Sequence, residues 1–261
     1  MQVVFMAKIV LDAGHGGQDP GAVQGERKEK DDNLALTLAV GKLLEKQGVD
    51  VVYTRADDVY QTPYEKAQIS NGENPDFLVS IHRNSSPKEN QYEGVETLVY
   101  DQSGDKLKMA EAINRHLERV GYQNLGPEER PGLVILRRTK DPALLVEAGF
   151  INSKKDNELF DEKFDETAQA IADGILEILN EEAQEEEKYY RVQTGAFRNQ
   201  EYTLDMERQL KEEGFPAFIV KSGDLYRVQV GAFKEMDNAI KMEAALRRRG
   251  YSTWIAYEPE Q

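Results

Sequence analysis

Residues 189–261 contain the same stretch of sequence twice. "YYRVQTGAF" from Tyr189 returns as "LYRVQVGAF" from Leu225, a step of 36 residues, and Gln193 and Gln229 match in the same register. Many identities at one fixed step indicate an internal duplication. Each copy has the pattern of a strand, a helix, a Gly turn and a second strand. Because one copy cannot cover its own apolar face, the two copies are predicted to pair into a single βαββαβ module.

The N-terminal part alternates apolar runs with helical stretches. The runs "IVLDAGHGG", "FLVSIHRNSS" and "ALLVEAGF" are separated by amphipathic segments such as "DDNLALTLAVGKLLEKQG" and "GDKLKMAEAINRHLERVG". This alternation predicts an α/β fold with a doubly wound, mixed or parallel sheet, followed by the small α+β module. We expect boundaries at 1–180 and 189–261. The acidic run between them, 181–188, has nothing apolar to bury, so it is interpreted as a linker or the frayed end of a helix.

Composition excludes several classes of function. The chain carries a net charge of −15, and the repeat has 11 basic and 11 acidic residues, so the remainder holds 22 against 37. A nucleic-acid partner is therefore not expected, since such proteins carry a basic surface. The chain has no cysteine, so any metal must be held by His and carboxylates. No stretch approaches the roughly 18 apolar residues of a membrane span. The first residues do not resemble a signal peptide, with Met1 and Met6 both possible starts.

The three apolar runs each end in a residue that can do chemistry, namely His15, His82 and Glu147. In doubly wound sheets, ligands gather beyond the carboxyl ends of the strands, so these side chains are expected to converge. Two imidazoles and one carboxylate leave the fourth position of a tetrahedral zinc open. A further carboxylate is then needed as a base, and the candidates are Glu29 and Glu147. A carboxylate that ends an apolar strand is readily tuned as an acid or base, which favours Glu147 as base and Glu29 as ligand.

Each of these residues also has a purely structural interpretation. The stretch "GHGGQDPGA" is compatible with an ordinary turn or a phosphate-binding loop, although it lacks the Lys and Ser/Thr of a P-loop. Glu29 would also favour a helix N-terminus through the helix dipole. Glu147 would also be explained as a partnered structural acid. His116 lies in a charged helical segment and is expected to face solvent.

Four motifs, "IVLDAGHGGQDPGA", "EKDDNLAL", "SIHRNSS" and "LLVEAGFINSKKDNELF", closely resemble in order and spacing those of the zinc-dependent N-acetylmuramoyl-L-alanine amidases. The repeat resembles a SPOR domain. The resemblance implies that Zn²⁺ is held by His15, Glu29 and His82, and that Glu147 is the catalytic glutamate. It also implies peptidoglycan as the partner, with cleavage of the amide between the lactyl group of N-acetylmuramic acid and L-alanine.

The mechanism implied by this resemblance has zinc polarising the scissile carbonyl. Glu147 deprotonates the attacking water and then protonates the leaving amine. Asn84 and Arg83, just past His82, are expected to orient the substrate. Two alternatives are a zinc peptidase acting within the stem peptide and a non-catalytic wall-binding protein; the latter would lack one of the four site residues, and none is missing.

The expected place of action is the cell wall. An amidase without an export leader but with a SPOR module is similar to enzymes that are made in the sporulating mother cell and released to digest its wall, and also to some phage lysins. Of these, we favour synthesis in the mother-cell cytoplasm, with a secreted wall enzyme as the alternative.

The two repeated strands are predicted to lie in the middle of one sheet, with both helices on one face. Alternation along the strands then places Val192 and Thr194 on one face and Gln193 and Gln229 on the other. From the pattern alone, the two Gln side chains would be solvated surface. The resemblance to SPOR domains, which are associated with glycan strands stripped of peptides, instead implies a sugar-binding face. There the Gln amides would bond hydroxyls and an aromatic such as Trp254 or Tyr226 would stack on a sugar. The N-terminal domain would thus make the denuded glycan that the repeat holds, in a processive arrangement.

Overall fold

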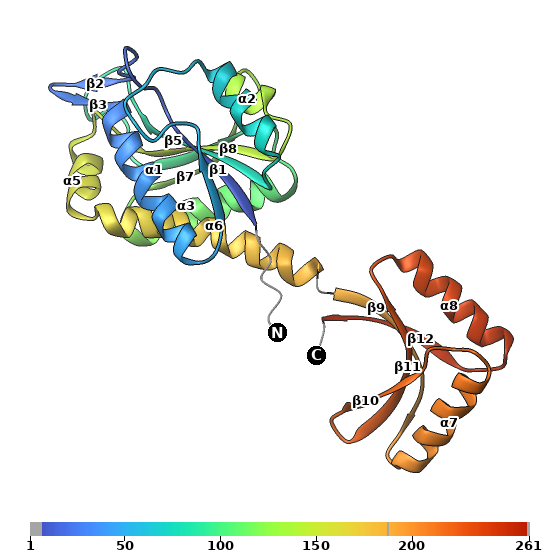
Figure 1. Cartoon of the computed structure of the whole chain (residues 1–261). Helices are drawn as coiled ribbons and strands as arrows, with labels where there is room; N and C mark the ends of the chain where they lie inside the picture. Colours follow the sequence, from blue (N-terminus) through green and yellow to red (C-terminus); the bar gives the residue numbers. More distant parts are fainter. Residues whose placement is uncertain (1–6, 187, 260–261) are drawn as a thin grey trace. The chain divides into compact units, whose positions relative to one another are not determined.

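The computed structural model of the chain describes residues 7–186 and 188–259. It divides into two compact units, residues 1–180 and 181–261, which are described separately (Figure 1). The two possible start residues, Met1 and Met6, lie outside the described residues. Within the described part, no helix has the length and apolar character needed to cross a membrane.

The N-terminal unit is built on a six-stranded mixed sheet with the order β4-β1-β5-β8-β6-β7. Strands β4, β1, β5 and β8 are parallel, whereas β6 pairs with β8 in the antiparallel sense and with β7 in parallel. A separate two-stranded hairpin, β2 and β3, precedes the first helix. The strands are β1 (Lys8–Ala13), β2 (Val23–Gln24), β3 (Arg27–Lys28), β4 (Asp50–Tyr53), β5 (Phe77–Asn84), β6 (Val95–Val99), β7 (Asn124–Glu129) and β8 (Ala143–Phe150).

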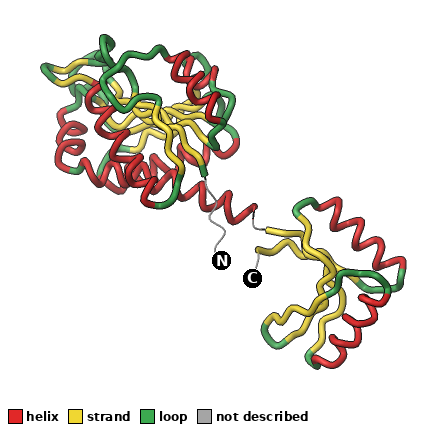
Figure 2. The backbone as a smooth tube through the Cα atoms, in the orientation of Figure 1, coloured by secondary structure: helices red, strands yellow, loops and turns green. Residues whose placement is uncertain are grey.

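Helices cover both faces of this sheet (Figure 2). One face packs against apolar residues of α1, α3 and α6, such as Leu36, Ile113 and Ile175, and the other face packs against α2 and α4 through Ala67 and Ile135. The central strands are therefore buried on both sides, which explains their nearly continuous apolar sequences. The helices are α1 (Glu29–Lys46), α2 (Pro63–Glu73), α3 (Gly104–Val120), α4 (Val134–Arg138), α5 (Lys154–Glu162) and α6 (Phe164–Glu186).

The acidic run after Asn180 is helical and not an extended linker. Helix α6 continues through it as far as Glu186, and the next strand begins at Lys188. Of the two interpretations of the run, the end of a helix is therefore the one that matches the structure.

The C-terminal unit is a four-stranded antiparallel sheet with the order β10-β11-β9-β12. The two repeated strands, β9 and β11, occupy the middle, as predicted. Both helices lie on one face (Figure 1), where Leu210 and Leu246 pack against Val192, Val228 and Val230. The elements are β9 (Lys188–Phe197), α7 (Gln200–Glu212), β10 (Phe218–Ser222), β11 (Leu225–Phe233), α8 (Met236–Arg248) and β12 (Thr253–Pro259).

The two Gln side chains on the opposite face are not solvated surface. Gln193 and Gln229 are neighbours in the sheet register and are only 2% and 1% exposed. Their other cross-strand neighbours are Trp254 and Phe218 respectively. The alternative in which the two Gln side chains are solvated surface is therefore wrong, because the face without helices still encloses its central side chains.

Candidate active site

The loop after β1 carries His15, and two buried cations donate hydrogen bonds to its backbone carbonyls. The guanidinium of Arg55 donates to the carbonyls of Ala13 (3.0 Å) and Gly14 (2.9 Å), and the Lys66 ammonium donates to the Ala13 carbonyl at 2.5 Å. His15 itself has a φ of 59°, in the left-handed region that non-glycine residues seldom adopt. The surrounding hydrogen bonds therefore fix a backbone conformation that the sequence alone would disfavour.

Two glycines of this loop make room for the site. A Cβ on Gly14 would lie 2.4 Å from the His82 imidazole, and a Cβ on Gly21 would lie 2.5 Å from Glu29 Oε2 and 2.6 Å from the His15 ring. Neither contact is sterically possible without displacing the functional side chain. The glycines of "GHGGQDPGA" are thus required by the close approach of site residues and not only by the turn.

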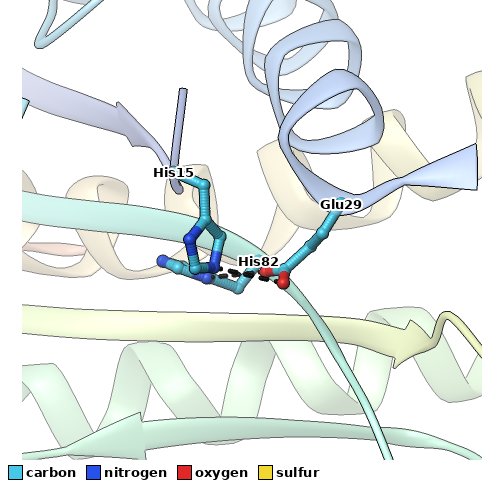
Figure 3. A group of neighbouring side chains, drawn as sticks. All are labelled: His15, Glu29 and His82. Atoms are coloured by element: carbon cyan, nitrogen blue, oxygen red, sulfur yellow. Dashed lines mark hydrogen bonds and ion pairs between the residues drawn. The ribbon is translucent and has the colours of Figure 1, made fainter. Parts of the chain in front are cut away.

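Glu29 reaches the site because the β2–β3 hairpin leads directly into α1, of which it is the first residue. Glu29 is 4% exposed, and its carboxylate faces both imidazoles, which lie next to each other (Figure 3). Oε2 is 3.1 Å from His15 Nε2, and Oε1 is 2.9 Å from His82 Nδ1. The helix N-terminus favours a negative charge at this position. The three residues come from three separate elements, yet their ligand atoms all lie within 4.8 Å of one another.

Each member of this trio is held by further hydrogen bonds. The backbone N–H of Ala22 donates to Glu29 Oε2 at 2.8 Å, and the Asn33 amide donates to Oε1 at 3.1 Å. His15 Nδ1 is 2.8 Å from a carboxylate oxygen of Asp19. A carboxylate behind a metal-binding imidazole fixes the ring orientation, and it is a common feature of metal sites.

The pKa shifts of His15 and Glu29 favour positive charge beside the Glu29 carboxylate. Burial lowers the pKa of His15, but Glu29 and then Asp19 outweigh it and raise the value to about 9. Burial would raise the pKa of Glu29, yet hydrogen bonds from His15 and His82 hold it well below its usual range. Protons or a metal ion can carry this charge. Two imidazoles and one carboxylate, with no thiolate, are a donor set that suits zinc.

Glu147 lies beside the trio on β8, directly opposite His82 in the sheet register. Alternation along the strands points both side chains to the α2 and α4 face. Burial is the largest effect on the Glu147 carboxyl and raises its pKa to about 7. Its Oε2 atom is buried without a hydrogen-bond partner among the described residues. A carboxyl group with this pKa exchanges protons readily near neutral pH, as a general base and acid must.

A cleft of about 300 Å³ opens beside His15 and His82. Its wall combines the two imidazoles with apolar side chains from α4 and β8, including Leu133, Val134 and Leu145. The floor contains the buried ion pair between Lys66 and Asp12, at 2.8 Å. The cleft therefore offers an apolar surface next to the candidate metal ligands.

Arg83 does not face this cleft, and its predicted substrate role is corrected. Because His82 points to one face of the sheet, Arg83 points to the other. It is 2% exposed and donates to Asp32 at 2.7 Å and to Asn157 at 2.8 Å, with its guanidinium 4.1 Å from the centre of the Phe160 ring. It is a structural cation that anchors α1 and α5 to the sheet.

The structure also places the other predicted residues. The Asn84 amide donates to Glu96 at 2.5 Å, so this side chain has a partner within the protein. His116 lies on α3, away from the trio, with Nε2 at 2.9 Å from Glu177, and its side chain is only 16% exposed. It is therefore half-buried and paired, and does not face solvent as expected.

Sequence reasoning missed the residues that support the site. Asp19 had a signal, since a carboxylate four residues after a candidate ligand can support the imidazole. Asn33 also had one, because it lies four residues after Glu29 and so on the same face of the helix. Arg55 and Lys66 had none, because their sequence positions do not reveal that they reach under the loop.

Comparison with known families decides the broader identity. The family model described as N-acetylmuramoyl-L-alanine amidase matches residues 9–177. The chain belongs to this family. A second model, the SPOR domain, matches residues 186–257. The amidase is therefore a peptidoglycan hydrolase that cleaves the bond between N-acetylmuramic acid and L-alanine, and its SPOR domain binds the glycan strands.

Relatives and solved structures agree with this assignment. The amidase is 36% identical to the endolysin of Bacillus phage SPP1 over 183 residues, which is 67% of each chain. It is 30% identical to a sporulation-specific N-acetylmuramoyl-L-alanine amidase of Bacillus subtilis over 221 residues, 82% of this chain and 85% of the relative.

The fold of the catalytic unit is shared with crystallised amidases. The N-acetylmuramoyl-L-alanine amidase of Clostridium difficile 630 superposes with a TM-score of 0.63 at 31% identity, covering 67% of this chain and 97% of that one. The catalytic domain of CwlV from Bacillus (Paenibacillus) polymyxa var. colistinus has a TM-score of 0.62 at 34% identity, covering 67% and 99%. The predicted α/β fold with a small second domain is confirmed.

Proposed function

We propose that the amidase holds one zinc ion through His15, Glu29 and His82. The observation that carries this assignment is the convergence of their ligand atoms within 4.8 Å from three separate elements. Zinc bound there would polarise the scissile carbonyl and make a water molecule acidic enough to attack near neutral pH. Asp19, Asn33 and Ala22 fix the orientation of the ligands, so little reorganisation is needed when the ion binds.

Glu147 is the proton carrier in this proposal. It is excluded from the trio, since its carboxyl group accepts no bond from the two imidazoles, and one of its oxygens has no partner among the described residues. With a pKa near 7, the carboxylate takes a proton from the attacking water. The resulting carboxylic acid then donates that proton to the nitrogen of L-alanine as the C–N bond breaks. The carboxylate is regenerated for the next cycle.

The apolar cleft beside the trio orients the substrate. Its wall from Leu133 and Val134 excludes water from one side of the scissile bond, which strengthens the electrostatic interactions at the reacting carbonyl. Asn84 lies past His82 at the end of β5, with its amide held by Glu96, and we retain it as a substrate-orienting residue.

Zinc analysis of single variants tests the division of roles between the two glutamates. Glu147→Gln should keep zinc but lose at least about 10²-fold in activity, since it removes a general base. Glu29→Ala and His15→Ala should lower the zinc content itself. Loss of zinc from Glu147→Gln together with retention by Glu29→Ala would show that the roles are exchanged. Asp31→Asn, on the first turn of the same helix but outside the trio, is the matched control.

The products distinguish this activity from that of a zinc peptidase. Mass spectrometry of digested peptidoglycan should show muramic acid with a free lactyl carboxylate and stem peptides with a free N-terminal L-alanine. Removal of the metal with a chelator should stop this release, and added zinc should restore it. Cuts within the stem peptide, with the muramoyl amide intact, would contradict the proposed role of the site.

On the SPOR domain, we propose that Gln193, Gln229 and Trp254 contact the glycan. The three share the face without helices and lie next to one another in the register β11-β9-β12. Both amide atoms of Gln229 are buried without a partner in the described part of the chain, so hydroxyl groups would satisfy them once the flanking side chains move aside. Tyr226 lies by alternation on the other face, paired in register with Phe197, and we leave it out of this surface.

Retention on glycan strands tests this surface. The full-length Trp254→Ala variant should bind peptide-free glycan more weakly than the unmodified chain, because a stacking platform is lost. Tyr202→Ala is the control, since Tyr202 is an aromatic residue on α7 that is even more exposed than Trp254, at 63% against 37%. Equal retention of the two variants would remove Trp254 from the binding surface.

We also propose that the enzyme acts in sporulation, on the wall of the mother cell that makes it. The match to the sporulation-specific relative extends over 82% of the chain, whereas the match to the phage endolysin covers 67%. A fluorescent fusion expressed from the native promoter should appear in the mother cell late in sporulation. Expression only during phage induction would favour the lysin alternative.

A further inference from the structure

The face of the SPOR sheet without helices repeats its own pattern through the duplication. Gln193 on β9 lies opposite Gln229 on β11, and the two residues are 36 positions apart. Trp254 flanks the first Gln and Phe218 flanks the second, again 36 positions apart. Both aromatic side chains are exposed. The face therefore consists of two matching halves, each with an amide and an aromatic ring.

Each half also carries an arginine. Arg191 and Arg227 stand two residues before Gln193 and Gln229 and so share their face. Their cross-strand neighbours on the adjacent repeated strand are alanines, Ala232 for Arg191 and Ala196 for Arg227. The alanines are exposed, so on the side of the adjacent repeated strand neither arginine is flanked by a large side chain.

Arg191 and Arg227 place two guanidinium groups on this face. Among the strand residues of the face whose side chains the structure describes, the others are apolar, aromatic or amide. Within the same part of the chain, Nε of Arg227 and both amide atoms of Gln229 are buried without a hydrogen-bond partner. The SPOR domain as a whole has 11 basic and 11 acidic residues. The two guanidinium groups therefore share one face of a domain that carries as many acidic as basic residues.

The reaction of the catalytic unit creates an anion on the glycan. Hydrolysis breaks the bond between the lactyl carbonyl carbon and the nitrogen of L-alanine, and the oxygen of water joins that carbon. The neutral amide becomes a carboxylate, and the peptide leaves with a protonated amine. Each turnover thus adds one negative charge to a muramic acid residue, at the position where the peptide was attached.

We propose that Arg191 and Arg227 bind the lactyl carboxylates left by this hydrolysis. The inference rests on the proposed binding of denuded glycan by this face and explains how that glycan is distinguished from intact substrate. A guanidinium can bond a carboxylate through two parallel hydrogen bonds, which a neutral amide cannot match. Recognition then depends on the charge that the reaction creates, and not only on the absence of the peptide.

The register indicates that the two arginines bind different carboxylates. Arg227 lies opposite Ala196, and Ala196 is five residues after Arg191 on β9. The bulge at Gly195 takes up one of these residues, so the two positions are separated by four steps along the strand. At about 3.4 Å per residue, the two Cα positions are roughly 14 Å apart along the strands. Both side chains cannot converge on one group without extending fully toward each other. Each half of the face would therefore meet its own muramic acid residue.

Chemical modification of the ligand tests the inference without changing the protein. Purified peptide-free glycan strands are compared with the same strands after coupling of methylamine to their carboxylates, which leaves a small neutral amide and no peptide. Binding to the full chain is measured with a chelator present, so that the amide is not hydrolysed. We expect the methylamide glycan to bind at least about 10-fold more weakly, as for the loss of charge-assisted hydrogen bonds.

Variants then connect this loss to the two residues. Arg191→Gln with Arg227→Gln should bind the acidic glycan as weakly as the unmodified chain binds the methylamide, and should no longer discriminate between the two ligands. Arg208→Gln removes the same charge from α7, where Arg208 is paired with Asp205, and should leave discrimination intact.

Two results separate the possible failures. Equal binding of acidic and methylamide glycan to the unmodified chain would overturn the role of the carboxylates and would leave steric exclusion of the peptide as the basis of selectivity. Binding of neither glycan would remove the proposed glycan surface itself, and the inference with it.

Discussion

The two units of the amidase place polar groups on apolar sheets in different ways. In the catalytic unit, the candidate site residues lie near the carboxyl ends of parallel strands and at a helix start. Glu29 accepts bonds from the Ala22 N–H and the Asn33 amide. In the SPOR domain, Gln193 and Gln229 lie in the middle of antiparallel strands, and Gln229 has no partner among the described residues for either amide atom.

The difference in hydrogen bonding corresponds to the different requirements of catalysis and of polymer binding. Catalysis needs groups held in one geometry, so hydrogen bonds within the protein satisfy the proposed ligands and leave Glu147, the proposed proton carrier, comparatively isolated. Binding a sugar polymer needs donors and acceptors that are still unsatisfied, because a hydroxyl that meets an already bonded amide gains little. Substitutions that remove buried polar groups should therefore have opposite effects on stability in the two units: loss of a hydrogen-bonded group destabilises, and loss of an unpartnered group stabilises.

The largest effect on stability is expected at Arg83. Arg83→Met removes the bonds to Asp32 and Asn157, while Arg27 still donates to Asp32 at 2.6 Å. The loss of these two bonds from a buried guanidinium should make unfolding easier by about 3 kcal/mol. Urea denaturation measures the change. Arg115→Met breaks an exposed pair with Glu177 and should cost less than about 1 kcal/mol. Similar losses in both variants would contradict the structural role of Arg83.

Because Glu147 Oε2 is buried without a partner among the described residues, the ionised form of Glu147 should lower the stability of the fold, and this effect should depend on pH. Its pKa is raised to about 7 from an ordinary 4.5, so between these values the folded chain binds more protons than the unfolded chain. The free energy of unfolding therefore falls as pH rises through this window and levels off above it. In metal-free protein, Glu147→Gln should gain at most about 3 kcal/mol near pH 8.

The same substitution should gain almost nothing near pH 4, where the carboxyl group is protonated in both states. Urea unfolding of the two proteins at both pH values supplies the measurement. A gain that is the same at both pH values would show that the carboxylate is not destabilised by its surroundings.

Close packing in the catalytic loop gives the next prediction. Gly14→Ala brings a methyl group to within 2.4 Å of the His82 ring, so the ring must move. Activity should fall by about 10²-fold, as expected for a displacement on the order of 1 Å at a reacting centre, and the zinc content should fall with it. Gly72→Ala, where nothing lies within 4 Å of the added carbon, should keep full activity.

The smallest effect, and the opposite sign, is expected in the SPOR domain. Gln229→Leu removes two unsatisfied amide atoms from a buried position, which should stabilise this unit by about 1–2 kcal/mol while glycan binding weakens. Gln209→Leu, on the exposed side of α7, should change neither quantity. A destabilised Gln229→Leu variant would indicate that the amide is satisfied in solution.

Sequence predicted the fold where periodicity and repetition were strong. The three apolar runs became β1, β5 and β8, and their order in the sheet brought His82 and Glu147 into register. Zinc ligation by Glu29, as opposed to a plain helix-start role, followed from the family resemblance and not from spacing. It remains a prediction, as do the other roles assigned to the site residues.

Other features were beyond sequence reasoning for physical reasons. Arg83 was misjudged because adjacency to His82 suggested a shared site, although neighbouring residues in a strand point to opposite faces. The burial of Gln193 and Gln229 depends on the side chains that flank them across the sheet, and cross-strand register is not visible in a single sequence. Lys66 and Arg55 act through bonds to backbone carbonyls, which carry no sequence signal.

The position of Trp254 has a practical consequence. It is the only tryptophan of the chain, and it lies on β12 beside Gln193, partly exposed to solvent. The intrinsic ultraviolet emission of the indole therefore reports on the proposed glycan surface alone, while the catalytic unit contributes only tyrosine signals. Rapid-mixing fluorescence can follow capture of a strand without any added dye, and amine release measured in the same sample follows cutting. The order of holding and cutting can thus be timed in one cuvette.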